Sequence, residues 1–469
     1  MIFNRSIVKT IYVAAAFSGI ISCKKSEDNP VIPANNTAVE LSGDLSTQTL
    51  DASKKYLLKG YVFVRSGQVL TIPAGTLLMG DKGSKGTLVI DKGGKIEAVG
   101  TVDKPIVFTS ENNPGERDKG DWGGIILLGS ANVNQVNPAI EGVNPSVTFG
   151  TNNSTANDGE SSGTLKYVRI EFAGIALSPN NEVNGLTMGG VGSGTTIENV
   201  QVSFSGDDAF EWFGGTVNAK NLVALGTWDD DFDTDFGFTG KIQFAVAVRD
   251  PYSADQSGSN GFESDNDAGG TTNIPLTAPV FSNVSLFGPR FDSTTAISGN
   301  YQHATHIRRR SAISIVNSVI TGFPTGIRLD GTSTYTNFNN GTGMLANNVL
   351  VSLGNRTAPK PFMGSGTADV ADTTVRNYYK ANNPAGYFVK SSTDFAAIGI
   401  DLNLYFGKTT PYSANPAFGV TSGIITSGSS FAAARLSTGF FTNVPYIGAF
   451  GGTDWTDGWA NFDPKNISY

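Results

Sequence analysis

Short runs of β-forming residues, in which inward and outward positions alternate, recur along most of the chain. Three of them are evenly spaced, at residues 70–72 (Leu-Thr-Ile), 88–90 (Leu-Val-Ile) and 106–108 (Ile-Val-Phe). Alternation is typical of strands that turn one face toward a core, and no long stretch keeps the helical period of about 3.6 residues. We therefore expect short, regularly spaced strands, and few and short helices.

A second repeat lies in the middle of the chain and carries acidic residues. Residues 205–212 (SGDDAFEW) return as residues 227–234 (TWDDDFDT), and Phe262 follows as a further copy of Phe210 and Phe232. A period of about 20 residues with β-type composition is the signature of a parallel β-helix, whose coils stack about 4.8 Å apart.

The two repeats together predict a single-stranded parallel β-helix. Its coils should lengthen along the chain, from the interval between Leu70 and Leu88 to the interval between Phe210 and Phe232 or more. The segments near 132–163 and 356–386 keep neither repeat, and we expect them to be long surface loops.

Composition and charge narrow the class of protein. The chain has 57 Gly and 20 Pro, and only 16% of its residues are charged, which fits a solenoid of many short strands and turns. A net charge of −8 argues against binding to nucleic acid and against polybasic binding to a membrane.

The repeat places one acidic column on the outside of the solenoid. We expect an inward column of Phe210, Phe232, Phe262, Ile307 and Ile327. The next residue in each coil should then face outward, because neighbouring strand positions point to opposite faces. This outward column reads Glu211, Asp233, Glu263, Arg308 and Arg328. It is either an exposed ladder of ion pairs or a surface that binds a cation or an anionic ligand.

Stacked carboxylates are unfavourable at this spacing unless they are solvated, protonated or bridged by a cation. Calcium is the cation that suits them, because it takes about six to eight oxygen ligands, and two His and one Cys make no convincing zinc set. The predicted calcium ligands are drawn from Asp207, Asp208, Glu211, Asp229, Asp230, Asp233, Asp235, Glu263 and Asp265. Not all of them can bind one ion, because they alternate between two faces.

Aromatic and basic residues beside the acidic coils are candidates for ligand binding. Trp212 and Trp228 would either stack on sugar rings or pack beneath a loop. Among the basic residues, Arg308, Arg310 and Arg328 would either pair with Glu263 or Asp265 or contact a carboxylated or sulfated glycan.

The N-terminus has the features of an export signal. Basic residues precede an apolar run at residues 11–21, which is too short to span a membrane and lies just before Cys23, the single cysteine. The residues before Cys23, Ile20-Ile21-Ser22, resemble the lipobox of bacterial lipoproteins, which implies that this cysteine carries a lipid. We predict a signal peptide at 1–22, a lipidated Cys23 with a flexible tether at 23–40, and a β-helix domain at 41–469.

Several segments resemble known families. Residues 69–76, 86–90 and 105–110 look like the opening coils of pectate-lyase-like right-handed β-helices. Residues 120–124, 205–208, 261–267 and 446–459 resemble large β-helix lipoproteins of Bacteroidota. This resemblance implies a right-handed solenoid that is held by a lipid in the outer membrane and faces the cell exterior, with an outer-membrane protein as a possible partner. It assigns no activity.

The catalytic motifs of related enzymes are incomplete. Gly206-Asp207-Asp208 resembles the acidic pair of polygalacturonases, but their Gly-His-Gly is absent and Arg-x-Lys occurs only upstream, at 117–119. We therefore predict no catalytic residue and expect a binding or scaffold protein for glycans with bound calcium. The alternative is a calcium-dependent lyase acting on an acidic polysaccharide.

Replacing Cys23 by alanine should abolish lipid attachment and leave uncleaved or soluble protein, because the lipid is attached through the thiol. Cell fractionation with metabolic labelling by a fatty acid measures this. Ser26→Ala, in the adjoining tether, is the matched control and should be processed normally. Membrane retention of fully processed Cys23→Ala protein would contradict the assignment.

Overall fold

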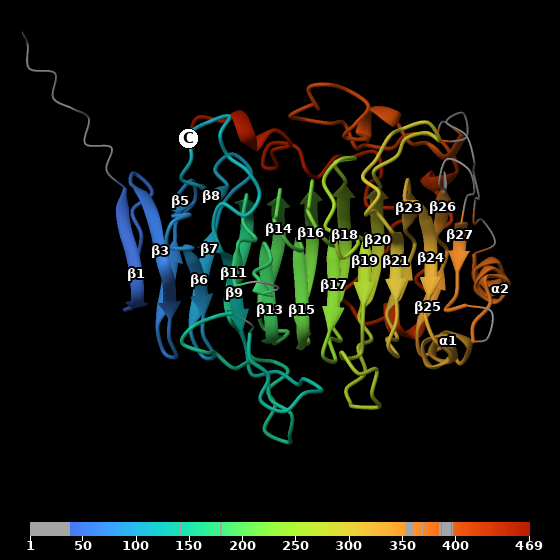
Figure 1. Cartoon of the computed structure of the whole chain (residues 1–469), viewed down its shortest axis with the longest axis horizontal. Coiled ribbons are helices and arrows are strands. Elements are labelled where there is room, and N and C mark those ends of the chain that lie inside the picture. The colour runs from blue at the N-terminus through green and yellow to red at the C-terminus, as the bar shows by residue number, and fades with distance from the viewer. Residues whose placement is uncertain are drawn as a thin grey trace, which may run out of the picture. The chain divides into compact units, whose positions relative to one another are not determined.

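The computed structural model describes residues 38–469 except 141, 179–180, 352–359, 367–368, 384–385, 387–394 and 396. Cys23 and the predicted signal peptide lie outside the described residues. The described residues form one 25-stranded sheet wound into a solenoid, and every strand pair in it is parallel (Figure 1). This architecture confirms the predicted parallel β-helix.

Each complete coil contributes strands to three faces, A, B and C, in that order along the chain. Face A contains β2 (Gln48–Thr49), β4 (Val69–Ile72), β7 (Lys95–Val99), β22 (Ser314–Val316), β25 (Met344–Ala346) and the first halves of β10 (Gly163–Glu171), β14 (Thr196–Ser203), β16 (Asn218–Leu225), β18 (Lys241–Val248) and β20 (Val280–Phe287). Face B contains the second halves of those five strands, the first halves of β1 (Val39–Leu45) and β3 (Lys55–Val64), and β5 (Leu77–Gly80), β8 (Ile106–Ser110), β23 (Val319–Thr321) and β26 (Val349–Val351).

Face C carries the acidic repeat. It contains the second halves of β1 and β3, and β6 (Thr87–Ile90), β9 (Gly124–Leu128), β13 (Leu186–Val191), β15 (Phe210–Gly215), β17 (Phe232–Asp235), β19 (Phe262–Ser264), β21 (His303–Ile307), β24 (Thr325–Leu329) and β27 (Lys360–Met363). A small antiparallel pair, β11 (Ala176–Ser178) and β12 (Asn181–Glu182), lies outside the solenoid sheet.

The acidic repeat follows the true coil period in the middle of the chain. Phe210 pairs with Phe232, and Phe232 pairs with Phe262. All three rings are buried, with centroid distances of 6.0 and 5.2 Å between successive rings. Apolar side chains from all three faces join this column in one continuous core.

The shorter coil period predicted for the first strands is wrong. Leu70 on face A pairs with Ile96, whereas Leu88 lies on face C and Ile106 on face B. Residues separated by the predicted interval therefore lie less than one full coil apart and on different faces. The sequences match because each face needs the same short apolar pattern toward the core.

Asparagine shapes the corner between faces A and B. Asn199, Asn221, Asn283 and Asn317 have φ values of 53, 59, 57 and 52°, in the left-handed region that asparagine tolerates better than most residues. This position turns the strand from one face to the next without breaking the hydrogen-bonded stack.

Residues 402–469 form a non-repetitive C-terminal segment, which includes the short 3₁₀ helices Leu402–Leu404, Ile424–Thr426, Ala434–Leu436 and Pro464–Asn466. It runs back along the solenoid (red in Figure 1) and covers outward apolar side chains of face B, such as Val223 and Val246, with a second hydrophobic cluster. The expected β-helix domain thus includes a covering segment after β27, the last strand of the sheet among the described residues.

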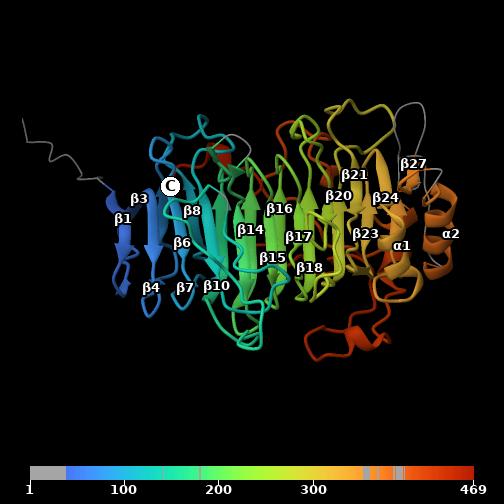
Figure 2. The same ribbon diagram turned by 60° about the horizontal axis from the view of Figure 1, so that its bottom comes forward.

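Helices are few and short in the described residues, as expected. They are α1 (Thr332–Asn339) and α2 (Asp372–Asn382), which lie at the end of the solenoid farthest from β1 (Figure 2). Val375 and Tyr379 of α2 are buried against the last coils. The predicted loop at 356–386 therefore contains β27 and α2. Within the described residues, no helix is long and apolar enough to cross a membrane.

Phe232→Ala should lower the free energy of unfolding by about 3–5 kcal/mol, because it leaves a cavity between two stacked rings in a packed core. Chemical denaturation monitored by circular dichroism measures the change. Tyr252→Ala is the matched control, because Tyr252 is 73% exposed and its loss should change stability little. Equal stability of both variants would contradict the inward register.

Candidate metal centre

The nine predicted metal ligands separate into a cluster of seven and two outlying residues. The cluster, hereafter the acidic cluster, comprises Asp207, Asp208, Glu211, Asp229, Asp230, Asp233 and Glu263. Its members come from the turns that lead into β15 and β17 and from the outer surface of β15, β17 and β19. Asp235 and Asp265 belong to none of its groups.

Carboxylate oxygens meet in three overlapping groups, in each of which one oxygen per residue lies within 4.8 Å of the others. The groups are Asp207 with Asp208 and Asp229, Asp208 with Glu211 and Asp233, and Asp230 with Asp233 and Glu263. Asp208 and Asp233 each belong to two groups, so the acidic cluster is continuous. The structure thereby joins the Asp208–Asp230 and Glu211–Asp233 pairs, which the sequence could not assign to one site.

Main-chain hydrogen bonds fix the carboxylates at the entry to face C. Asp230 N donates to Asp208 Oδ1 at 2.8 Å, and Asn260 N donates in turn to Asp230 Oδ1. His303 N continues the series by donating to Asn260 Oδ1 at 3.1 Å. Each side chain therefore accepts from the backbone of the next coil, which holds these carboxylates in one orientation.

Some carboxylate oxygens of the acidic cluster have no hydrogen-bond donor among the described residues. Asp229 Oδ1 and Asp233 Oδ1 are buried without such a partner. Burial of an acceptor without a donor or cation is costly, whether the carboxyl group is charged or neutral. These two oxygens are therefore the strongest structural sign that the acidic cluster fits a cation.

Burial and mutual repulsion raise the pKa values of the acidic cluster. Burial, followed by the charges of neighbouring carboxylates, raises the pKa of Asp229 to about 10. Burial and the charge of Glu263 raise the pKa of Asp230 to about 8. Burial and the charges of neighbouring carboxylates also raise the pKa values of Asp208, Glu211 and Asp233 well above their usual range. At neutral pH these groups must either hold protons or share a cation.

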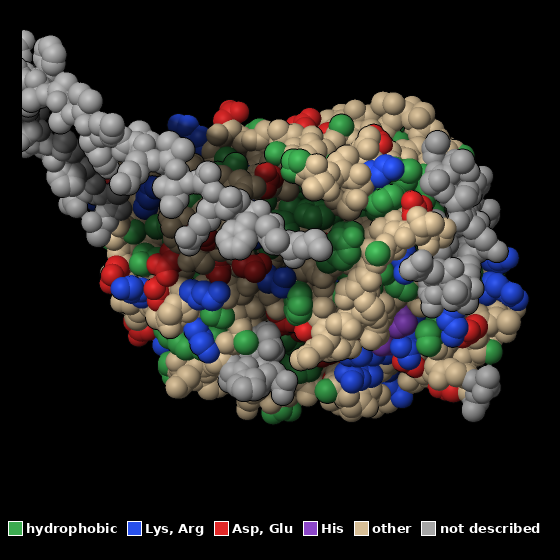
Figure 3. Space-filling model, turned by 45° about the horizontal axis from the view of Figure 1, so that its top comes forward, with side chains coloured by type: hydrophobic (Ala, Val, Ile, Leu, Met, Phe, Trp, Pro, Cys, Tyr) green, Lys and Arg blue, Asp and Glu red, His purple; other side chains and the backbone are tan. Residues whose placement is uncertain are grey.

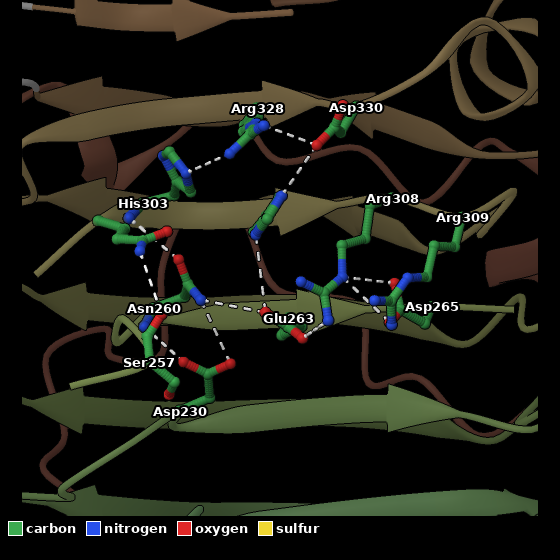
Figure 4. Close-up of polar contacts among 12 residues, drawn as sticks. Asp230, Ser257, Asn260, Glu263, Asp265, His303, Arg308, Arg309, Arg328 and Asp330 are labelled. Atoms are coloured by element: carbon green, nitrogen blue, oxygen red, sulfur yellow. Dashed lines mark hydrogen bonds and ion pairs between the residues drawn. The ribbon is translucent and has the colours of Figure 1, made fainter. Parts of the chain in front are cut away.

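Glu263 closes the acidic cluster on the side of a basic network (Figure 4). Arg308 binds Glu263 and also donates from Nε to Asp265 Oδ1 at 2.9 Å. Although burial raises the pKa of Glu263, its hydrogen bond with His306 and the charge of Arg308 hold the pKa below its usual value. The positive charge that compensates this end of the acidic cluster is thus supplied by the protein itself.

The basic network extends through His306 to the next coil. His306 lies 3.6 Å from Glu263 Oε2 and 3.3 Å from Asp330 Oδ2. Asp330 also pairs with Arg328 at 2.7 Å, and Arg328 Nη1 lies 3.0 Å from His303 Nε2. Burial lowers the pKa of His303 to about 2, so its ring is neutral and accepts this bond.

The predicted outward column is correct at Arg328 and wrong at Arg308. Glu263 pairs with His306, and His306 pairs with Arg328. The predicted register of β21 is displaced by one inward and one outward residue, from Thr305 to Ile307. Both residues face inward, so this displacement leaves every side chain on its correct face and only changes its partner. Arg308 lies after the end of β21 and pairs with Glu263, as predicted by the alternative in which this arginine forms a structural ion pair.

The other predicted ligand-binding residues have structural partners. Trp212 is fully buried between Phe210 and Phe238, so the expectation that it stacks on a sugar is wrong. Trp228 is half-buried, donates from Nε1 to Asp255 at 2.8 Å and lies 4.3 Å from Lys119 Nζ. Arg310 donates to the backbone oxygen of Gly270 at 3.3 Å.

The two outlying acidic residues are also engaged. Asp265 pairs with Arg308 and, at 2.6 Å, with Arg309. Asp235 accepts a hydrogen bond from Phe236 N at 2.6 Å, and burial raises its pKa to about 8. Neither residue is brought into a group that could hold a metal ion.

Sequence reasoning missed two asparagines of the site. Asn184 donates to Glu211, and Asn260 donates to Asp230 and Glu263 at 3.4 and 3.3 Å. Each stands two positions before the inward residue of its coil, where Asp208 and Asp230 stand in theirs. The shared spacing was a usable signal, but a search restricted to acidic residues passed over it.

Comparison with known families defines the class of protein. Residues 41–391 match the family described as a pectate-lyase like beta helix domain. The match covers more than half of the chain, and the protein therefore belongs to this family. Searches of curated proteins and of solved structures find no match.

In the presence of a chelator, the melting temperature should fall as the pH rises from about 5 to about 9. The folded pKa values of Asp229 and Asp230 lie above the usual carboxyl value, so the folded chain binds more protons than the unfolded chain in this interval. Their contribution to stability is full below the unfolded pKa and is lost as the pH rises toward the folded pKa.

Differential scanning fluorimetry across this pH range tests the prediction. Asp233→Asn should flatten the dependence, and Asp103→Asn, at an exposed position, should leave it unchanged. A melting temperature that rises with pH would contradict the electrostatic account of the acidic cluster.

Proposed function

We propose that the protein is a lipid-anchored, non-catalytic binding or scaffold protein of the outer membrane, which faces the cell exterior, binds calcium at the acidic cluster and engages glycans. One observation carries the calcium assignment: carboxylates from three successive coils converge, and the buried oxygens Asp229 Oδ1 and Asp233 Oδ1 have no donor among the described residues.

The donor set fits calcium better than other common cations. The three groups offer carboxylate oxygens alone, which are the ligands that hard cations prefer. Calcium tolerates irregular geometry with about six to eight oxygens, whereas magnesium demands a near-ideal octahedron. The groups that contain Asp208, Glu211 and Asp229 fit best, because Glu263 is already paired with Arg308. Bound calcium would stabilise the coils by neutralising stacked charge.

The ion pairs made by the nearby arginines favour a binding function over the lyase alternative. A lyase of this kind needs a base that can accept a proton beside the metal. Arg308 is held by Glu263 and Asp265, and Arg328 is held by Asp330. Each carboxylate partner stabilises the charged guanidinium, which opposes loss of its proton.

The proposed location rests on the sequence around Cys23. The apolar run before Cys23 and the polar tether after it fit a lipoprotein whose folded domain is held away from the membrane. An outer-membrane protein is the partner that we propose for such an anchored solenoid.

Removal of calcium should lower the melting temperature at neutral pH, and added calcium should restore it by mass action. Calcium at about 100 times its dissociation constant would add about 2.7 kcal/mol to the free energy of unfolding. Magnesium should restore less, because of its stricter geometry. Thermal melts in EDTA and after readdition of each ion measure the effect, and mass spectrometry of the native protein gives the metal content.

Paired variants assign the response to the acidic cluster. Glu211→Gln and Asp233→Asn should lose the calcium response, whereas Asp103→Asn should keep it. An unchanged melting curve in EDTA, with no calcium by mass spectrometry, would refute the metal site and favour compensation by protons and by the basic network.

A further inference from the structure

A cavity of about 440 Å³ lies at the corner between faces B and C, beneath the C-terminal segment. It is lined by parts of the chain that are far apart in sequence: residues 117–119, Phe172 and Phe204, residues 250–253, residues 406–407 and 409–412, and residues 462–463 and 465–466. Figure 3 shows the side of the molecule that carries the C-terminal segment, where hydrophobic side chains lie in a hollow beside charged ones. Part of the lining, between residues 406 and 466, lies outside the family match, and the rest lies within the matched residues 41–391.

Aromatic rings form a continuous row in the wall of the cavity. Phe172 stacks on Phe204 with a centroid distance of 5.6 Å and an interplanar angle of 5°. Phe204 meets Phe406 edge to face at 6.2 Å, and Phe406 stacks on Tyr412 at 5.0 Å. Phe204 and Phe406 are only half-buried, and Tyr252 at the rim is 73% exposed. The row therefore offers apolar surface to a ligand.

Hydrogen-bonding groups surround the aromatic row, and their charges balance. Three basic residues, Arg117, Lys119 and Lys465, and three acidic residues, Asp118, Asp250 and Asp463, line the cavity. Arg117 is already occupied, because its guanidinium donates to the backbone oxygens of Asn112, Pro464 and Ile467. The cavity has no excess of positive charge for an acidic ligand.

We propose that this cavity binds an uncharged sugar unit of the glycan, an inference that rests on the proposed glycan-binding function. A pyranose ring has apolar C–H faces and a rim of hydroxyl groups. The cavity offers the complement, with rings from Phe204 and Phe406 and carboxylate, ammonium and hydroxyl groups around them. Its volume lies in the range of about 300–1,000 Å³ that is typical of small-ligand sites.

This assignment separates the two sites of the molecule. Lys119, which lines the cavity, lies over the ring of Trp228 in the turn that carries Asp229. The sugar site and the acidic cluster are thus neighbours that use different side chains. The acidic cluster then stabilises the coils, and the cavity provides the recognition.

Saturation-transfer NMR and titration calorimetry with defined hexasaccharides test the proposal. The uncharged probes are cello-, xylo-, manno- and maltohexaose, and the acidic probes are an oligogalacturonate and a heparin-derived hexasaccharide. We expect at least one uncharged probe to bind, and Tyr252→Ala and Phe406→Ala to weaken its binding at least about tenfold. Ile274→Ala is the matched control, because Ile274 is 76% exposed and lies away from the cavity.

Calcium-dependent melting of the same variants confirms that each is folded and separates this inference from the metal assignment. If no uncharged probe binds while the calcium response is intact, the sugar site is refuted and the metal site stands. If an uncharged probe binds without any calcium response, the metal site is refuted and the sugar site stands. Preference for an acidic probe that is lost in Asp233→Asn would place the glycan at the acidic cluster and overturn the proposal.

Discussion

In-register stacking of parallel strands is the constraint on which the rest of this molecule depends. Each coil lies about 4.8 Å above the last, so a residue type that recurs at the coil period contacts its own copies. Phenylalanine benefits from this arrangement, and Phe210, Phe232 and Phe262 stack in the core. The same stacking is unfavourable for the carboxylates at the neighbouring outward position, because Glu211, Asp233 and Glu263 repel one another. One repeat thus produces both a stabilising aromatic column and an electrostatically unfavourable acidic one.

The chain compensates the acidic column differently at its two ends. Toward the C-terminus, His306 and Arg328 continue the column itself, and Arg308 reaches back to Glu263, so that positive charge is built into the structure. Toward the N-terminus, Asn184 supplies only an amide donor to Glu211. A cation or protons must supply the remaining compensation there.

The sequence was sufficient for the fold and for the middle of the site because the acidic and aromatic repeats reinforce each other. Asp233 could be matched to Glu211 only in one register, since Phe232 then falls on Phe210. Beyond Phe262 the loop before β21 removes that spacing, and a match by apolarity alone selects Ile307, whereas Phe262 pairs with Thr305 and both residues face inward. The coil period predicted for the first strands was wrong for a related reason, because strands on different faces carry the same short apolar pattern. The cavity beneath the C-terminal segment could not be predicted at all, since its walls are distant in sequence and meet only when that segment folds back.

Side-chain amides on faces A and B hold that segment in place. Gln201 exchanges two hydrogen bonds with the backbone of Asn461, and Gln243 does the same with Thr442. Asn317 makes the corresponding pair with Ser430. An amide has the donor and acceptor of a peptide group, so it can bind an irregular chain as a neighbouring strand would, without requiring the segment to follow the coil period. The segment is therefore free to differ in sequence from the solenoid and to bring Phe406 and Tyr412 to the corner beside Phe204. The same amide contacts that hold the segment over face B therefore also position the aromatic row at this corner, which couples the shape of the cavity to the packing of the solenoid.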